Sequence, residues 1–262
     1  MDMTLQNLHN RMLAKHTMLC VGLDTDPAKL PAGVGILDFN KAIIDATAPY
    51  CVAFKPNLAF YESLGSEGLR ILEKTVDYLR TNHPDQFLIA DAKRGDIGNT
   101  ARMYAKTYFE TMDFDAVTLS PYMGRETVEP FLGHPGKFAI VVALSSNPSA
   151  ADFQTVGEKP LYRKVMETMM EIGSPDELMF VVGATKADKL QEIRTFCPDH
   201  FFLVPGVGAQ GGSAEEVIAH GANALGGLLI NSSRGVLYAS QGPDFATAAA
   251  DTARRTARYE GR

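Results

Sequence analysis

The chain has 262 residues, 45% of them hydrophobic, so it is long enough to bury a large core in one α/β domain. Its 25 lysines and arginines against 31 aspartates and glutamates give a net charge of −6, which disfavours nucleic acid as a partner. No apolar run approaches membrane-spanning length, and the polar start MDMTLQNLHN lacks the apolar core of a secretory signal. We therefore expect a cytoplasmic protein that binds neither nucleic acid nor membranes.

Eight short runs rich in β-branched and aromatic residues alternate along the chain with longer stretches of helical period. They span residues 17–23, 51–55, 86–91, 116–120, 137–144, 178–183, 201–206 and 226–231. Eight alternations in about 250 residues predict a single (β/α)8 TIM barrel, an α/β fold of one domain over residues 1–262. An open doubly wound sheet is the alternative.

Two segments between these runs carry clear helix signals. After the third run, one apolar face is predicted from residues that step by three or four: Ile97, Ala101, Tyr104, Tyr108 and Met112. After the seventh run, Ser213 followed by Glu216 predicts a helix that begins with a capping box.

The cysteines and histidines indicate no metal or disulfide chemistry. Cys20, Cys51 and Cys197 are an odd number without CxxC spacing, so buried structural thiols are expected. The six histidines show no HxxxH or HxH pairing. These residues therefore indicate neither a disulfide framework nor a thiolate metal site, and their spacing gives no argument for a catalytic histidine.

Charged residues follow three neighbouring strands in matching phase. Because side chains alternate along a strand, Asp91 and Lys93 share a face, and the first and second strands end in Asp24 and Lys55. In a barrel the C-terminal ends of the strands carry the active site, so these four side chains are expected to converge at one mouth. A solvated loop rim or a structural ion-pair network is the alternative interpretation.

The stretch LIADAKRGDIGNTA resembles the D-x-K-x-x-D-I-x-x-T signature of orotidine 5′-phosphate decarboxylases, at Asp91, Lys93, Asp96, Ile97 and Thr100. The resemblance covers nearly the whole chain, through the segments GLDTDP, FKPNLAFYE, SPYMG, SSNPSA, PGVGAQGG and SSRG. The length and the segments SSNPSA and GAT are similar to the longer bacterial branch of the family, type 2. This resemblance implies a metal-free and cofactor-free barrel enzyme that converts orotidine 5′-phosphate to UMP and CO2 in de novo pyrimidine biosynthesis.

Loss of CO2 from a ring carbon without an adjacent carbonyl leaves a localised carbanion at C6. One ammonium about 4 Å away at an effective dielectric near 20 supplies roughly 4 kcal/mol, so several contributions must combine. The resemblance implies that Lys93 is this ammonium and then protonates the carbanion. Asp91 and Asp96 keep Lys93 charged, and Lys55 holds Asp91 ionised.

The resemblance also implies how the rest of the nucleotide is held. The implied substrate-binding residues are Asp24, Asn57, Thr100, Ser146, Gln210, Ser233 and Arg234. Asp24 and Lys55 would hold ribose hydroxyls, with Asp96 and Thr100 reaching the ribose across a homodimer with shared active sites. Ser146 would meet the base edge, with Ser145 as an open alternative, and the last three residues would bind phosphate.

Other interpretations stay open at this point. GVGAQG matches the dinucleotide fingerprint, but it follows the seventh run, and the next run ends in LLINSS without an acid for a ribose hydroxyl, which argues against a nicotinamide site. Mg²⁺-dependent sugar-phosphate decarboxylases and synthases share D-x-K-x-x-D but tend to carry glutamate at Lys55. A catalytically silent phosphate-ligand binder and a purely structural protein are further alternatives.

Overall fold

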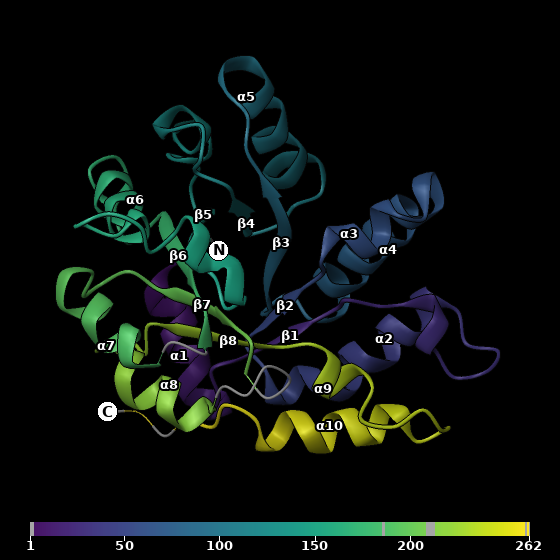
Figure 1. The fold of residues 1–262 in the computed structure, drawn as a ribbon. Coiled ribbons are helices and arrows are strands. Elements are labelled where there is room, and N and C mark those ends of the chain that lie inside the picture. Colours follow the sequence, from purple (N-terminus) through teal and green to yellow (C-terminus); the bar gives the residue numbers. More distant parts are fainter. Residues whose placement is uncertain (1–2, 185–186, 208–212, 260, 262) are drawn as a thin grey trace.

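The computed structural model describes residues 3–184, 187–207, 213–259 and 261, and its strands form a closed barrel (Figure 1). All neighbouring strands are parallel and follow chain order, and β8 pairs back to β1 with Asn231 opposite Cys20. The strands are β1 (Leu19–Gly22), β2 (Ala53–Lys55), β3 (Phe87–Arg94), β4 (Ala116–Leu119), β5 (Phe138–Leu144), β6 (Leu178–Val182), β7 (Phe202–Pro205) and β8 (Leu228–Ser232). The predicted TIM barrel is confirmed, because the β1–β8 pair rules out an open sheet.

Helices surround the barrel (Figure 1). The α-helices are α1 (Leu5–Lys15), α2 (Ile36–Thr47), α3 (Leu58–Glu62), α4 (Gly65–Asn82), α5 (Gly98–Lys106), α6 (Leu161–Met170), α7 (Ala187–Phe196), α8 (Ala214–Gly221), α9 (Arg234–Leu237) and α10 (Phe245–Arg255). Short 3-10 helices are η1 (Pro27–Lys29), η2 (Ala48–Tyr50), η4 (Arg125–Thr127), η5 (Glu129–Phe131) and η6 (Pro148–Asp152), and η3 (Thr107–Thr111) is a π-helical turn. The crossover from β4 to β5 therefore contains only 3-10 helices where other crossovers contain α-helices.

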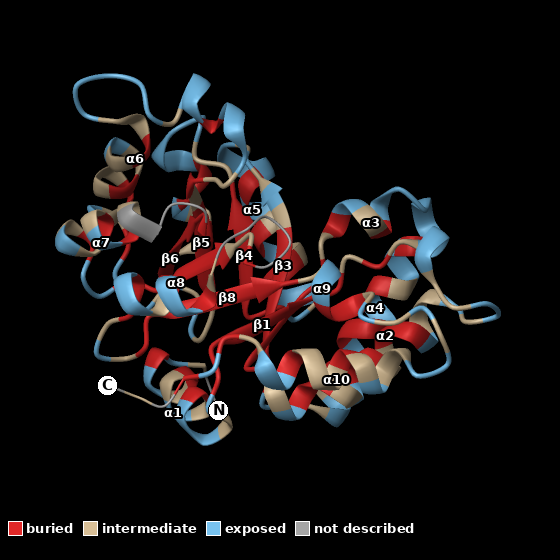
Figure 2. Ribbon diagram, turned by 60° about the horizontal axis from the view of Figure 1, so that its bottom comes forward, coloured by how far each residue is buried: buried red, intermediate tan, exposed pale blue. Residues whose placement is uncertain are grey.

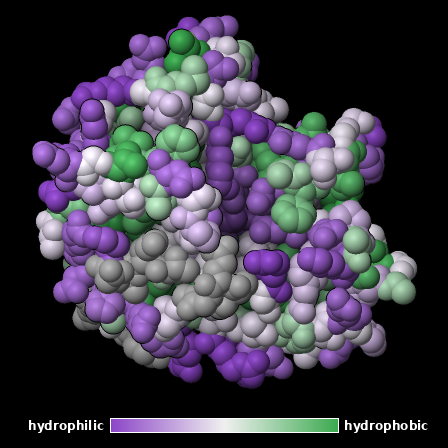
Figure 3. Space-filling model, in the orientation of Figure 1, coloured by the Kyte–Doolittle hydropathy of each residue, from purple (hydrophilic) through white to green (hydrophobic). Residues whose placement is uncertain are grey.

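The strands are buried on both faces, whereas the helices are buried only where they face the barrel (Figure 2). A parallel barrel has this property because side chains fill its inside and helices cover its outside. Phe87 and Phe138, both without exposed surface, meet edge to face with their ring centroids 5.7 Å apart. On the outer surface, the face seen in Figure 1 is hollowed near its centre and hydrophilic there (Figure 3).

Both helix predictions locate a helix, and one needs a correction. Ser213 caps α8 by accepting a hydrogen bond from Glu216 N–H (3.2 Å). In α5 and η3, Ala101 and Tyr108 are buried as predicted, but Ile97 is 42% exposed. Ile97 was wrongly assigned to the buried face, because it is the N-cap residue of α5 and precedes the first helical turn.

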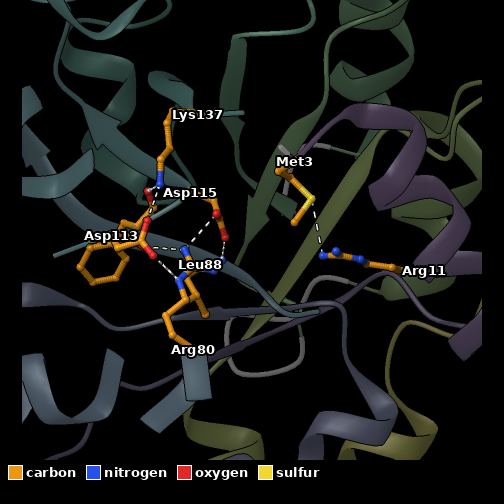
Figure 4. A network of polar contacts seen from close by, with 8 residues as sticks. Met3, Arg11, Arg80, Leu88, Asp113, Asp115 and Lys137 are labelled. Carbon is orange, nitrogen blue, oxygen red and sulfur yellow. Dashed lines mark hydrogen bonds and ion pairs between the residues drawn. The ribbon is translucent and has the colours of Figure 1, made fainter. Parts of the chain in front are cut away.

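A polar network lies at the N-terminal ends of β3, β4 and β5 (Figure 4). Asp115, just before β4, accepts hydrogen bonds from Leu88 N–H (2.8 Å) and from Arg80 of α4 (2.9 Å). Asp113 forms ion pairs with Arg80 (3.2 Å) and with Lys137 at the start of β5 (2.8 Å). These contacts bind one helix and three strands at the end of the barrel that serves stability.

Two further expectations concern the chain as a whole. The three cysteines are buried and form no disulfide, as predicted. Among the described residues, every helix is too short or too polar to cross a membrane.

Candidate active site

Three charged side chains meet at the C-terminal ends of β2 and β3. Lys55 ends β2 and is 3% exposed, and its Nζ lies 2.8 Å from Oδ2 of Asp91. The other carboxylate oxygen, Oδ1, lies 2.5 Å from Nζ of Lys93, whose side chain is 53% exposed. We call Lys55, Asp91 and Lys93 the charged cluster. Its alternating signs pass from the barrel interior to the surface, as the strand phases predicted.

The backbone of β3 is irregular where it presents Lys93. The register with β4 shifts between Ala90 and Arg94, and Lys93 has a φ of +47°, in the left-handed region. Its N–H donates to Oγ1 of Thr118 (2.9 Å), and the Thr118 hydroxyl donates to Oδ1 of Asp91 (3.1 Å). Thr118 therefore stabilises both the strained backbone and the carboxylate, and strained residues of this kind concentrate at functional sites.

Electrostatics keeps Asp91 and Lys55 ionised. Burial alone would raise the pKa of Asp91, but the ammonium groups of Lys55 and Lys93 outweigh burial and hold that pKa well below its ordinary value. Burial likewise disfavours the charged form of Lys55, yet the carboxylates of Asp91 and Asp24 raise its pKa above the ordinary value. Asp91 and Lys55 are therefore an ionised pair that exists before any ligand binds, and electrostatic catalysis requires such preorganised charges.

The two residues predicted beside the cluster differ in how their side chains are used. Asp24 follows β1, and its Oδ1 is buried without a hydrogen-bond partner among the described residues. Asn57 pairs with Asp91 in an isolated parallel bridge and caps α3 by accepting a hydrogen bond from Ala59 N–H (3.2 Å). Asp24 thus offers an unused acceptor close to Lys55, whereas the oxygen of Asn57 is engaged in its own helix.

Asp96 and Thr100 lie away from the charged cluster. Asp96 accepts a hydrogen bond from Ile97 N–H (2.8 Å) and forms no ion pair with any lysine among the described residues. Thr100 is exposed on α5. Among the described residues, Lys93 is therefore paired with Asp91 and forms no ion pair with Asp96.

The predicted phosphate side is described only in part. Gln210 lies outside the described residues. Arg234 is exposed at the start of α9, and the Ser233 hydroxyl accepts a hydrogen bond from Nδ2 of Asn231 (3.2 Å). A Cβ at Gly22 would lie 1.9 Å from Oγ of Ser233, so glycine is required there to let β1 pass this loop.

A cavity of about 890 Å³ adjoins the charged cluster on the side of β5 and α6. Lys93 and Gln154 line it together with apolar side chains that include Val142, Val165 and Met169. The cavity brings an apolar surface next to the exposed ammonium of Lys93.

Comparison with known proteins decides the family. Residues 17–250 match the family model described as Orotidine 5'-phosphate decarboxylase / HUMPS family. The chain belongs to this family. It is 55% identical over 251 residues to the orotidine 5'-phosphate decarboxylase of Christiangramia forsetii, covering 93% of this chain and 92% of that protein. It is 52% identical over 262 residues to that of Phocaeicola vulgatus, covering 97% and 96%.

A solved structure gives the same result. The OMP decarboxylase of Leishmania donovani superposes with a TM-score of 0.79 at 34% identity, covering 96% of this chain and 99% of that chain. The resemblance to orotidine 5′-phosphate decarboxylases and the predicted enzyme class, a carboxy-lyase, are confirmed by these findings. The assignment to the type 2 branch stays a prediction.

Two side chains at the family's barrel mouth were not found from the sequence. Thr118 could have been found from the sequence. Alternation along residues 116–120 places it on the same face of the strand as Ala116. Asn231, 7% exposed and with Oδ1 unpaired among the described residues, gave no such signal. Asn231 lies next to Gly22 because β8 pairs with β1, and that pairing exists only in the closed barrel.

Proposed function

We propose that this chain decarboxylates orotidine 5′-phosphate to UMP and CO2, the last step of de novo pyrimidine biosynthesis. The observation that carries the proposal is the charged cluster, in which an ionised Asp91 between two lysines holds the Lys93 ammonium at the mouth of the barrel. The relatives from Christiangramia forsetii and Phocaeicola vulgatus, named for this activity, support it. The free buried thiols fit the reducing cytoplasm, where we place the enzyme.

The chemistry follows from the charges. As CO2 leaves C6, the electron pair stays on that carbon, and the Lys93 ammonium stabilises the developing negative charge. The carbanion then takes a proton from Nζ of Lys93, giving UMP. Asp91 forms an ion pair with Lys93 and holds its ammonium at the mouth, and Lys55 compensates the buried carboxylate so that it stays ionised. No reorganisation of these groups is needed at the moment of reaction, which is the benefit of a preorganised site.

Binding of the remote nucleotide groups supplies the rest of the rate enhancement in this proposal. Asp24, whose Oδ1 is unpaired among the described residues, and Lys55 hold ribose hydroxyls, and Asn57 borders them. Ser233 and Arg234 bind the phosphate together with Gln210, since a guanidinium meets phosphate oxygens in a bidentate fork. Ser146 meets the pyrimidine.

The experiment that tests this function is direct. The purified chain is mixed with orotidine 5′-phosphate and EDTA, and the loss of orotate absorbance is followed. We expect full activity with the chelator, because Lys55 takes the place where metal-dependent relatives carry a glutamate. Among the described residues, moreover, no three His, Cys, Asp or Glu side chains gather as a metal site. An activity that disappears with EDTA and returns with Mg²⁺ would support a metal-dependent relative instead.

We also propose a homodimer with shared active sites, in which Asp96 and Thr100 reach the partner's ribose. The support is that large apolar side chains are exposed at Ile97 and Met103 of the Asp96 segment and at Tyr122 and Met123 after β4, with Tyr122 86% exposed. The two segments approach each other where a Cβ at Gly95 would lie 2.9 Å from the carbonyl oxygen of Ser120, and exposed apolar side chains on neighbouring segments are typical of interfaces.

Hybrid dimers test this arrangement. Lys93→Ala and Asp96→Ala subunits, each inactive alone, are mixed, dissociated with mild denaturant and reassembled. If each site combines Lys93 of one subunit with Asp96 of the other, half the dimers are hybrids with one intact site, and about a quarter of wild-type activity returns. A fully active monomer in light scattering, or no recovery in the hybrids, contradicts the shared site.

A further inference from the structure

Gln154 holds the segment that leaves β5. Its Oε1 accepts a hydrogen bond from Ser145 N–H (2.7 Å), and its Nε2 donates to Oγ of Ser145 (2.9 Å). Ser145 directly follows β5, so one glutamine side chain engages both the backbone and the hydroxyl of the first residue after the strand. Amide groups that bond a residue in two places fix its orientation as well as its position.

Both polar hydrogens of Ser145, on its backbone nitrogen and its hydroxyl, are engaged within the loop and are not available to a ligand. A serine hydroxyl has a single hydrogen, and Oγ lies 2.6 Å from Oδ1 of Asn147, closer than the 3.2 Å to Oε1 of Gln154. The hydroxyl therefore donates to Asn147 and accepts from Gln154. Of the two serines in SSNPSA, Ser145 therefore belongs to the loop's own structure, and Ser146 is the serine that the proposed function places against the base.

Ser146 is held from a second direction by Gly183, the residue after β6. A Cβ at Gly183 would lie 2.7 Å from the backbone N of Ser146 and 2.8 Å from its Cα and Cβ. Such distances are far inside normal contact, so the absence of a side chain at position 183 is what lets the two strand ends approach. The backbone of Ser146 thus lies against Gly183 and directly follows the residue that Gln154 bonds.

Gln154 is itself anchored. Its N–H donates to the carbonyl of Ala150 (2.8 Å), and its carbonyl accepts from the N–H of Tyr162 in the first turn of α6 (2.9 Å). A continuous series of contacts therefore runs from α6 through Gln154 and Ser145 to the end of β5. Gln154 also lines the cavity that Lys93 lines, so this series ends at the active site.

We propose that Gln154, together with Gly183, is a positioning residue for pyrimidine recognition: it fixes the backbone that leads into Ser146, the residue that the proposed function places against the base. The inference rests on the proposed function, because it takes the ligand of Ser146 to be a pyrimidine nucleotide. It goes further by assigning a role in base recognition to Gln154, a side chain of the segment between β5 and α6. Gln154 acts through Ser145 and forms no part of the charged cluster.

The test separates the base from the phosphate. UMP carries the pyrimidine, ribose and phosphate, whereas ribose 5-phosphate lacks only the base, and binding of each is measured by isothermal titration calorimetry. Gln154→Ala is expected to weaken UMP binding about tenfold, the loss typical of a removed hydrogen-bond pair, and to leave ribose 5-phosphate unchanged. Gln154→Glu keeps an acceptor for Ser145 N–H but loses the donor, so its loss for UMP is expected to lie in between.

Controls keep the result interpretable. Gln6→Ala removes an exposed glutamine whose side chain bonds only to Asn10 in the described structure, and it should leave both affinities as in wild type. Gly183→Ala places a methyl group too close to the backbone of Ser146 and should show the same selective loss of UMP binding. It serves as the second variant if Gln154→Ala does not fold.

Two outcomes overturn the inference: equal weakening of both ligands, which marks a general structural role, and unchanged UMP binding in both variants. Failure of the proposed function is recognised separately, because a wild-type chain that binds UMP but does not decarboxylate orotidine 5′-phosphate refutes the activity and leaves the binding comparison standing. A wild-type chain that binds ribose 5-phosphate but not UMP refutes the inference by itself.

Discussion

Two buried aspartates lie at opposite ends of the β3–β4 pair and differ in almost everything except burial. Asp91, 9% exposed, has two lysines and a threonine around its carboxylate at the C-terminal end. Asp115, 7% exposed, has one arginine and one backbone N–H at the N-terminal end. Their pKa values shift in opposite directions: that of Asp91 is lowered, and that of Asp115 is raised because burial outweighs Arg80.

The difference teaches how this barrel separates catalysis from stability. At Asp91 more positive charge is gathered than one carboxylate needs, and the surplus ammonium of Lys93 faces the mouth. At Asp115 burial outweighs the charge of Arg80, and the carboxylate links α4 to β3 through its hydrogen bonds from Arg80 and from Leu88 N–H. Equal burial therefore says little about function, whereas the number and placement of the surrounding cations says much.

The largest effect is expected from Lys93→Ala, which removes the surplus charge at the mouth. The decarboxylation rate should fall by at least roughly 10³-fold, the value of one ammonium about 4 Å from the developing charge at an effective dielectric near 20. The rate is measured by orotate absorbance with saturating substrate, and stability by urea unfolding. Lys164→Ala, which removes another exposed lysine from the same cavity, is the matched control and should retain activity. A Lys93→Ala enzyme within tenfold of wild type would refute the assigned role.

Asp91→Ala should affect both activity and stability. It leaves Lys55 buried without its ion-pair partner, and breaking such a pair costs about 3 to 5 kcal/mol of unfolding free energy. Activity should also be lost, because Lys93 is no longer held. Urea unfolding of the single variant and of Lys55→Met/Asp91→Ala measures the coupling. The double variant should recover part of the stability and none of the activity; equal stability of the two variants would contradict a coupled pair.

Asp115→Ala should affect stability alone. It leaves the Leu88 N–H without its acceptor and removes an ion pair of Arg80, at a cost of about 1 to 3 kcal/mol. Because the change lies at the end of the barrel away from Lys93, kcat for orotidine 5′-phosphate should stay at the wild-type value under conditions where the variant is folded. A fall in kcat similar to that of Asp91→Ala would mean that the two ends are not independent.

The smallest effects are expected in the pH dependence of stability, and they should have opposite signs. The lowered pKa of Asp91 contributes stability that is present above its unfolded value, near pH 4, and is lost as the pH falls through the folded value. The raised pKa of Asp115 contributes stability that is present below its unfolded value and is lost as the pH rises through the folded value.

Urea unfolding between about pH 3 and pH 7 checks these signs against Asp91→Asn and Asp115→Asn. The stability advantage of wild type over Asp91→Asn should shrink as the pH falls. Relative to Asp115→Asn, wild type should gain stability over the same interval. Parallel curves for the two variants would show that the aspartates have the same electrostatic environment.

The sequence by itself determined the number and order of the strands and which strand ends carry charge, and it favoured a barrel over an open sheet. Apolar runs such as 137–144 bury on both faces wherever they pack, so local pattern suffices to find them. Alternation along a strand is equally local, and it predicted that Asp91 and Lys93 meet. The signature around Asp91 then carried the family resemblance that the comparisons confirmed.

Only the tertiary structure decided how those charges are held. Local sequence pattern did not predict the left-handed backbone at Lys93 or its hydrogen bond to Thr118. It also did not predict the hydrogen bonds of Gln154 to Ser145 or the opposite pKa shifts of Asp91 and Asp115. Nor did it predict that Ile97, which the helical period placed on a buried face, is exposed. The physical reason is that desolvation and hydrogen bonding depend on which distant segments pack together, and closure of the barrel sets that packing.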